Sequence, residues 1–244
     1  FRRVLFRSKR EMCGFKDFVY ENKKLLVFSA LLVLVIYAYR IFNYNIGIDT
    51  DNYLNNYEWF NKFWFPSEGR FGISLLNLFF LTGPSFKLNI YIANLLACAF
   101  LFISNLIWIY IFKNFERNNN TFYFAFSLFY LSSVVWVEII YFTIHAPAVM
   151  LGVLLCSLSV LFTCKNLRSE RKGDGMLAVF LGVCALSMYL PLITVYVSGF
   201  LIVYIMSVDS EERVRQKSGF VKPVIFSIVM LFIYYVLNFF FIRF

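Results

Sequence analysis

Hydrophobic residues run along this chain in long segments that are separated by short polar stretches. A helix needs about 20 apolar residues to cross the hydrocarbon core of a bilayer, because each residue rises about 1.5 Å. By that measure the pattern predicts membrane spans at residues 25–42, 88–112, 121–138, 146–164, 176–190, 191–206 and 224–242. The predicted fold class is therefore an all-α, polytopic transmembrane helical bundle of about seven spans.

Two apolar segments depart from this pattern. Residues 71–82 are too short to cross comfortably and end at Gly83-Pro84, which favours an interfacial or re-entrant helix. Residues 176–206 form one long apolar stretch that Pro191 interrupts, so we expect a tight turn there between two short spans.

The placement of basic residues decides whether 71–82 crosses the membrane. If it does not cross, most of the lysines and arginines fall on one side, in the leader and in the loops after residues 112, 164 and 206. The positive-inside rule then predicts a multi-pass protein with a cytoplasmic N-terminus and an outward-facing first loop, residues 43–87.

Composition agrees with a membrane protein and narrows the chemistry. The chain is 61% hydrophobic and only 15% charged, whereas soluble domains are about a quarter charged. Its net charge of +9 therefore reflects loop orientation, and we expect the lipid bilayer, not a nucleic acid, as its partner. A single histidine and five cysteines without a C-x-x-C pair argue against a zinc site, and no glycine-rich phosphate loop is present.

Both ends of the chain qualify the domain assignment. The first eight residues resemble the translation of a sequencing adapter, so residues 1–12 are read as an artefact or leader before Cys13. Residues 13–244 then form the transmembrane domain. It ends within an apolar run at Phe244, as expected of the front part of a longer protein.

The first loop contains a predicted interfacial helix. Tyr53, Leu54, Tyr57, Phe60 and Trp64 recur at helical spacing with polar residues between them, which predicts about three amphipathic turns lying along the membrane surface. We expect Pro66 and Gly69 to stop this helix.

The same loop carries the main candidates for catalysis, Asp49 and Asp51. Asp51 has an alternative role as the N-cap of the interfacial helix. Asp49 follows Ile48 just outside the first span, and close to low-dielectric surroundings a carboxylate has a raised proton affinity and suits a general base. The two carboxylates could hold a divalent metal, but two alone do not specify one, so no metal ligand is assigned.

Arg70 and Glu68 close the loop. The guanidinium of Arg70 matches phosphate oxygens, so we predict a phosphate clamp, with an interfacial anchor paired to Glu68 as the alternative. Gly69 would let a bulky ligand approach the backbone.

Further ionisable residues flank the next turns on the same side. Glu138 and His145 are either interface residues or groups facing a shared cavity, and ionisable groups in a cavity are functional candidates. Tyr189 and Tyr196 could line that cavity or anchor the chain in the aromatic belt.

These motifs resemble a known family in their order and topological side. Phe-Asn-Tyr-Asn-Ile-Gly-Ile-Asp-Thr-Asp at 42–51 and Glu-Gly-Arg-Phe-Gly at 68–72 resemble the bacterial Gtr-type glucosyltransferases, of the GT-C class. Val-Trp-Val-Glu-Ile-Ile-Tyr-Phe at 135–142 and Ala-Leu-Ser-Met-Tyr-Leu-Pro at 185–191 add to the likeness. Leu190 departs from it, because a glutamine is expected after the tyrosine.

The resemblance implies a GT-C fold and an activity. Such enzymes move a sugar, here glucose, from a polyprenyl-phosphate donor to a cell-surface polysaccharide such as O-antigen, or to a glycolipid, on the outer face. Asp49 would then activate the acceptor, and Arg70, with His145 as a second candidate, would stabilise the departing phosphate. No cofactor beyond this donor is expected.

Two other classes stay open. A transporter or flippase of polyprenyl-linked or other amphiphilic substrates would place ionisable groups near the bilayer midplane and use repeated halves, neither of which the sequence shows. A scaffold for membrane partners would make the carboxylates of the first loop dispensable.

Overall fold

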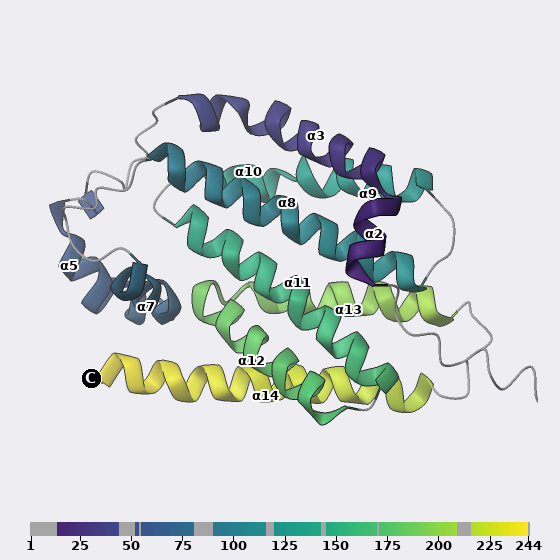
Figure 1. The fold of residues 1–244 in the computed structure, drawn as a ribbon. Helices are drawn as coiled ribbons and strands as arrows, with labels where there is room; N and C mark the ends of the chain where they lie inside the picture. Colours follow the sequence, from purple (N-terminus) through teal and green to yellow (C-terminus); the bar gives the residue numbers. More distant parts are fainter. Residues whose placement is uncertain are drawn as a thin grey trace, which may run out of the picture.

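The computed structural model describes residues 14–43, 52–53, 55–80, 90–115, 120–142, 145–169, 171–208 and 216–243, and in these ranges the regular structure is helical. Figure 1 shows a bundle with α11 (Ala146–Ser169) near its centre, between α8 (Ile90–Phe115) and α12 (Lys172–Met188). The all-α fold class predicted from the sequence is confirmed.

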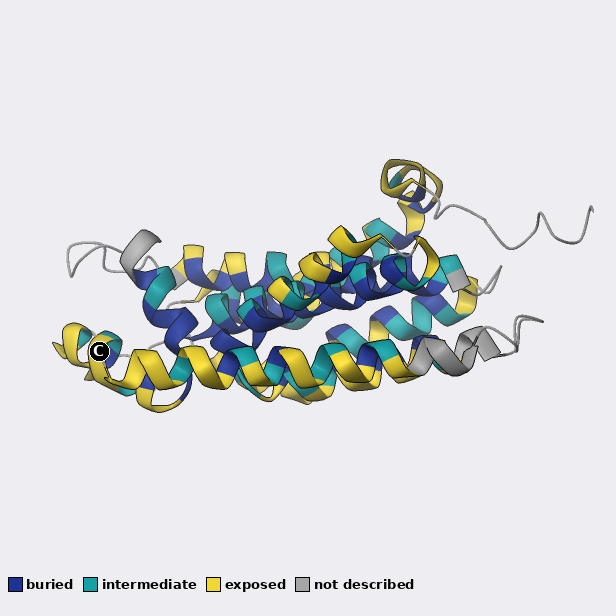
Figure 2. Cartoon of the chain, turned by 90° about the horizontal axis from the view of Figure 1, so that it is seen from below, coloured by how far each residue is buried: buried dark blue, intermediate teal, exposed yellow. Residues whose placement is uncertain are grey.

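Among the described residues, five helical segments are long and apolar enough to span a membrane: Lys23–Phe42, Tyr91–Asn114, Asn120–Tyr141, Ala146–Ser169 and Val221–Arg243. Burial separates a core from a periphery among these segments. In the 18-residue apolar window of each, 67% of the residues are buried in Tyr91–Asn114 and 61% in Ala146–Ser169, against 11% in Val221–Arg243. Figure 2 shows that peripheral helix, α14 (Gln216–Arg243), with exposed residues recurring from residue 221 onward. A long helix with exposed apolar residues is suited to contact lipid.

The remaining predicted pair of spans corresponds to α12 and α13 (Leu192–Val208), each 17 residues long. The turn between them lies where Pro191 predicts it. Tyr189 is extended, and its carbonyl accepts a hydrogen bond from the Leu192 amide at 3.0 Å. The interruption of the long apolar stretch is therefore a turn between two helices.

The predicted span 121–138 contains a break that the apolar pattern does not reveal. It consists of α9 (Asn120–Leu131) and α10 (Val134–Tyr141), with Ser133 extended at ψ 128° between them. The carbonyl of Leu131 at the break accepts a hydrogen bond of 2.8 Å from the Tyr37 hydroxyl of α3 (Lys23–Phe42). A buried tyrosine thus satisfies a backbone group that lipid could not.

The bundle has two chemically different ends. At the N-terminal end lie α2 (Phe15–Glu21) and the ends of α8 and α11 at Phe115 and Ser169. At the opposite, first-loop end lie α5 (Tyr57–Trp59), the π-helix η1 (Phe60–Trp64), α6 (Phe65–Ser67) and α7 (Phe71–Phe80). The last turn of α14 reaches the same end.

Helix α7 stays at the first-loop end and does not cross the bundle, as its length predicts. It packs against α6 and α12. Gly72 lies against Ser187, so closely that a Cβ at this position would overlap the serine side chain. The glycine therefore lets α7 approach the end of α12.

Candidate functional site

The first-loop segment folds around a small aromatic core of its own. Phe60 and Phe65 are buried, with Tyr53, Ile73 and Met188 completing the cluster. The predicted amphipathic helix is therefore present, but it is not a regular α-helix. Its middle, Phe60–Trp64, is a π-helix, in which the amide of Phe65 donates to the carbonyl of Phe60.

The π-helix explains why Pro66 does not stop the helix as expected. Proline inside an α-helix clashes with the carbonyl four residues earlier and lacks an amide to donate. Here the wider π turn immediately precedes Pro66, and the helix continues to Ser67. Such turns occur often at functional sites.

Gly69 ends the helix as predicted, through a Schellman motif. Its φ is +74°, the left-handed conformation that glycine adopts without steric cost. The amide of Gly69 donates to the Pro66 carbonyl at 3.0 Å, and the amide of Arg70 donates to the Phe65 carbonyl at 2.7 Å. The position of Arg70 is therefore determined by backbone hydrogen bonds.

The space beside Gly69 is filled by the protein itself. The Tyr234 hydroxyl, from α14, donates a hydrogen bond of 2.8 Å to the carbonyl of Gly69, and a Cβ on this residue would overlap that hydroxyl. The close approach for which glycine is needed is thus made by a tyrosine 165 residues away, and not by a ligand.

Aromatic rings surround the guanidinium of Arg70. Its Cζ lies 5.8 Å from the centre of the Trp64 ring and 5.5 Å from that of Tyr189. Tyr189 is thus part of this cluster, whereas Tyr196 is buried elsewhere and its hydroxyl lies 2.9 Å from the Thr163 hydroxyl. The rings of Trp64 and Tyr189 provide cation–π contacts that hold the Arg70 guanidinium in place.

No carboxylate among the described residues forms an ion pair with Arg70. Glu68, its expected alternative partner, is exposed and is two residues away in the chain. Within the described part of the chain, the donors of the guanidinium are therefore not paired with a carboxylate, which is what binding of an anion requires.

His145 completes the cluster from the turn before α11. It is only 8% exposed, its ring stacks on Trp64 at 5.9 Å, and Phe65 meets it edge-on at 5.2 Å. Burial, and then the neighbouring charge of Arg70, lower the pKa of His145 to about 4. The imidazole is therefore neutral near pH 7 and can offer a hydrogen bond but no second positive charge.

Other candidates from the sequence are placed differently. Glu138 is exposed on α10, whose buried side carries Trp136 and Ile140, and no contact joins it to Arg70 or His145. Asp49 and Asp51 lie outside the described residues. The roles of these three carboxylates stay predictions.

Sequence reasoning missed a second arginine at this end. Arg40 is only 9% exposed, and its Cζ lies 3.6 Å from the centre of the Tyr141 ring. Its backbone carbonyl accepts a hydrogen bond of 2.8 Å from the side-chain Nδ2 of Asn94. A signal was available, because Arg40 is the single charged residue in the apolar run 25–42.

Most of the chain, including this cluster, matches a known protein family. The family described as Glucosyl transferase GtrII matches residues 38–244, from the last turn of α3 to the end of the chain. The chain belongs to the GtrII glucosyl transferase family. No curated protein and no solved structure gives a significant match.

Membership of the GtrII family indicates glucosyl transfer as the class of reaction. The matched region includes the first loop, the Arg70–His145–Trp64 cluster and all helices from α5 onward. In the described part of this GtrII chain no group of three or more histidine, cysteine or acidic side chains could hold a metal ion. What the described residues do offer is a guanidinium beside a neutral imidazole, an arrangement suited to an anionic leaving group.

Proposed function

We propose that this GtrII chain transfers glucose from a polyprenyl-phosphate donor to a hydroxyl of a cell-surface polysaccharide or glycolipid. The observation that carries the proposal is the Arg70 guanidinium, which is positioned by a Schellman motif and two aromatic rings and is not neutralised by a described carboxylate. A preorganised cation of this kind stabilises charge that develops on a leaving group.

The proposed reaction is a single inverting displacement. The acceptor hydroxyl gives its proton to the Asp49 carboxylate while its oxygen bonds to the anomeric carbon. The bond between that carbon and the phosphate oxygen breaks, and the electron pair leaves with the lipid phosphate. Arg70 binds the phosphate oxygens, and His145 contributes one hydrogen bond from its neutral ring.

We assign the first-loop end to the outer face of a bacterial inner membrane. Lysines and arginines at the N-terminal end support this orientation, since basic residues favour the cytoplasmic side. The described members of that group are Lys16, Lys23, Lys24, Lys113, Lys165, Arg168, Arg171, Lys172 and Lys222. A topology reporter inserted at residue 60 should be accessible from outside, and a cytoplasmic signal would overturn the orientation.

Transfer of radiolabelled glucose from polyprenyl-phosphate glucose to purified acceptor tests the function. The full-length protein should catalyse this transfer, and Asp49→Asn should reduce the rate at least about 100-fold, because general bases contribute about 10²–10⁴-fold. Glu58→Gln is the matched control, since Glu58 lies in the same loop and its one ion pair with a described residue is the surface pair with Lys62, at 3.2 Å.

Two outcomes would contradict the proposal. Unchanged transfer by Asp49→Asn would remove the proposed base. Movement of the intact glucosyl lipid across vesicles, without transfer to acceptor, would instead favour the transporter or flippase.

A further inference from the structure

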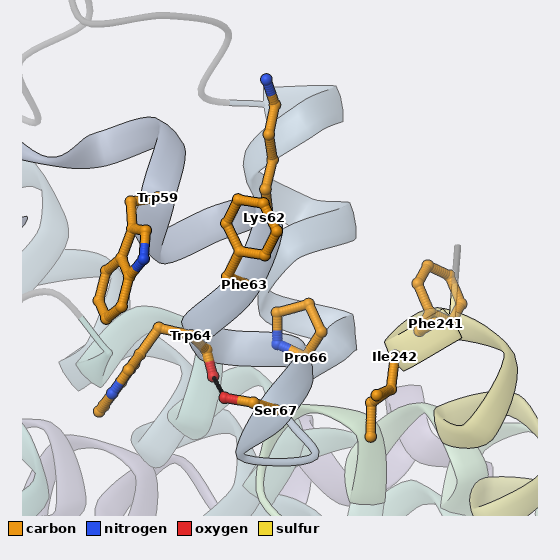
Figure 3. Close-up of a pocket in the computed structure, with 8 residues that line it drawn as sticks. All are labelled: Trp59, Lys62, Phe63, Trp64, Pro66, Ser67, Phe241 and Ile242. Atoms are coloured by element: carbon orange, nitrogen blue, oxygen red, sulfur yellow. Dashed lines mark hydrogen bonds between the residues drawn. The ribbon is translucent and has the colours of Figure 1, made fainter.

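A pocket of about 240 Å³ lies between the first-loop helices and the end of α14. Figure 3 shows side chains of η1 and α6 on one wall and two side chains of α14 on the other. Its lining is mainly apolar: Trp59, Lys62, Phe63, Trp64, Pro66, Ser67, Phe241 and Ile242. The hydrogen bond from the Tyr234 hydroxyl to the Gly69 carbonyl joins α14 to the first-loop segment and so positions the α14 wall of the pocket.

The polar groups in the lining already have partners. The Ser67 hydroxyl donates a hydrogen bond of 2.8 Å to the Trp64 carbonyl, and Lys62 pairs with Glu58 while extending away from Phe241 and Ile242. The pocket is also smaller than the roughly 300–1,000 Å³ typical of whole small-molecule sites. These properties suit a segment of an apolar chain better than a sugar or a complete ligand.

Trp64 belongs both to this pocket and to the Arg70–His145–Trp64 cluster. It lines the pocket, its ring lies 5.8 Å from the Arg70 guanidinium, and it stacks on His145. An apolar surface and a cation without a described counter-charge therefore both adjoin Trp64. The ligand that satisfies both is an amphiphile whose anionic group is attached directly to a hydrocarbon chain.

We infer that the pocket formed by η1, α6 and the end of α14 binds the phosphate-proximal part of the donor's prenyl chain while Arg70 holds its phosphate. This inference rests on the proposed function and deepens it, because it assigns a part of the donor to pocket residues that do not act on the reacting atoms. Pocket residues then determine how strongly the enzyme prefers long-chain donors.

Donors of different chain length test the inference in the full-length protein. Phe63→Ala and Ile242→Ala remove lining side chains that are 63% and 56% exposed, so the fold should persist. Each variant should raise the KM for a long-chain polyprenyl-phosphate glucose about tenfold, since a buried apolar side chain is worth this much in binding. The KM for a donor that carries no isoprene unit, such as the methyl ester of glucose 1-phosphate, and the value of kcat should change less than about twofold, because that donor leaves the pocket empty. Phe240→Ala is the matched control for Ile242→Ala. Phe240 lies on the same helix and is 53% exposed, against 56% for Ile242, but it does not line the pocket.

A photoreactive prenyl phosphate without sugar provides a readout independent of transfer. With a diazirine on its first isoprene unit it should label residues 59–67 or 241–242. Labelling elsewhere, equal labelling by a diazirine-bearing phospholipid, or a wild-type chain-length preference in both pocket variants would overturn the inference. Failure of the proposed function is distinct, since the wild-type protein would then transfer no glucose from a donor of any length.

Discussion

The two ends of the bundle both carry positive charge, but they use it differently. At the N-terminal end, Lys113 pairs with Glu21 at 3.4 Å, and Arg168 donates to the Asn114 carbonyl at 2.8 Å from an exposed position. At the first-loop end, Arg40 and Arg70 lie against aromatic rings, and no described carboxylate pairs with either. Partial enclosure by aromatic rings without a described counter-charge, and not the number of charges, therefore marks the candidate site.

The largest effect is expected from removing the enclosed cation. Arg70→Ala should lower kcat about 100-fold, because a preorganised donor to developing charge is worth about this much. Arg168→Ala, which removes an exposed arginine from the opposite end, should leave transfer within about twofold. Equal losses in the two variants would erase the distinction between the ends. Glucose transfer with saturating donor is the measurement.

The next effect concerns the backbone turn that holds Arg70. Gly69→Ala forces an L-residue into φ +74° and places its Cβ against the Tyr234 hydroxyl. We expect a loss of about 1–3 kcal/mol of stability, seen as a lowered Tm in detergent, with reduced transfer.

Gly72→Ala is a useful companion, because it overlaps Ser187 without a positive φ. Tyr234→Phe combined with Gly69→Ala should restore part of the Tm by removing the hydroxyl. No restoration would show that the strain lies in the backbone alone.

A smaller effect should appear as a pH dependence of stability. The pKa of His145 is lowered to about 4 in the folded protein, whereas an unfolded histidine titrates near 6.5. As pH falls from 6.5 toward 4 the unfolded chain gains a proton that the folded protein does not, so stability is full above 6.5 and decreases below it. Since this is the single histidine in the chain, His145→Gln should flatten the Tm profile between pH 6.5 and 5. A wild-type slope in that variant would contradict the assignment.

The smallest effect is expected at the exposed ion pair of the N-terminal end. Glu21→Gln, which removes the exposed partner of Lys113, should change the stability by no more than about 1 kcal/mol, because surface pairs contribute about 0–1 kcal/mol. The measurement is Tm at low and at high salt. A loss comparable to that of Gly69→Ala would mean that this end is also structurally sensitive.

Much of the fold could be predicted from periodicity and length. The predicted span 25–42 corresponds to Lys23–Phe42, and 146–164 to Ala146–Ser169, because a long apolar run has few alternatives to a helix in lipid. The break at Ser133 could not be predicted in this way. It depends on a carbonyl that Tyr37 satisfies from another helix.

The candidate site was predictable only in part. Arg70 and His145 were identified because charge is rare in this chain, and the structure places both beside Trp64. Their protonation states and partners were not predictable, since burial and neighbouring charge determine them. Glu138 had the same two alternative roles as His145 in the sequence, yet it lies outside the cluster, because only the packing of the helices decides which side chains meet. Arg40 was overlooked for the same reason.

The sequence by itself determined that the protein is a helical membrane bundle, and that its few ionisable residues include a carboxylate and arginine group in the first loop. Composition and hydrophobic length suffice for this, because the cost of unpaired backbone groups in lipid leaves a helix as the solution for each span. Only the tertiary structure decided which of those residues meet. Gly69 and Tyr234 are 165 positions apart, and their contact, with the packing of Trp64 and Tyr189 around Arg70, exists only once the helices are assembled.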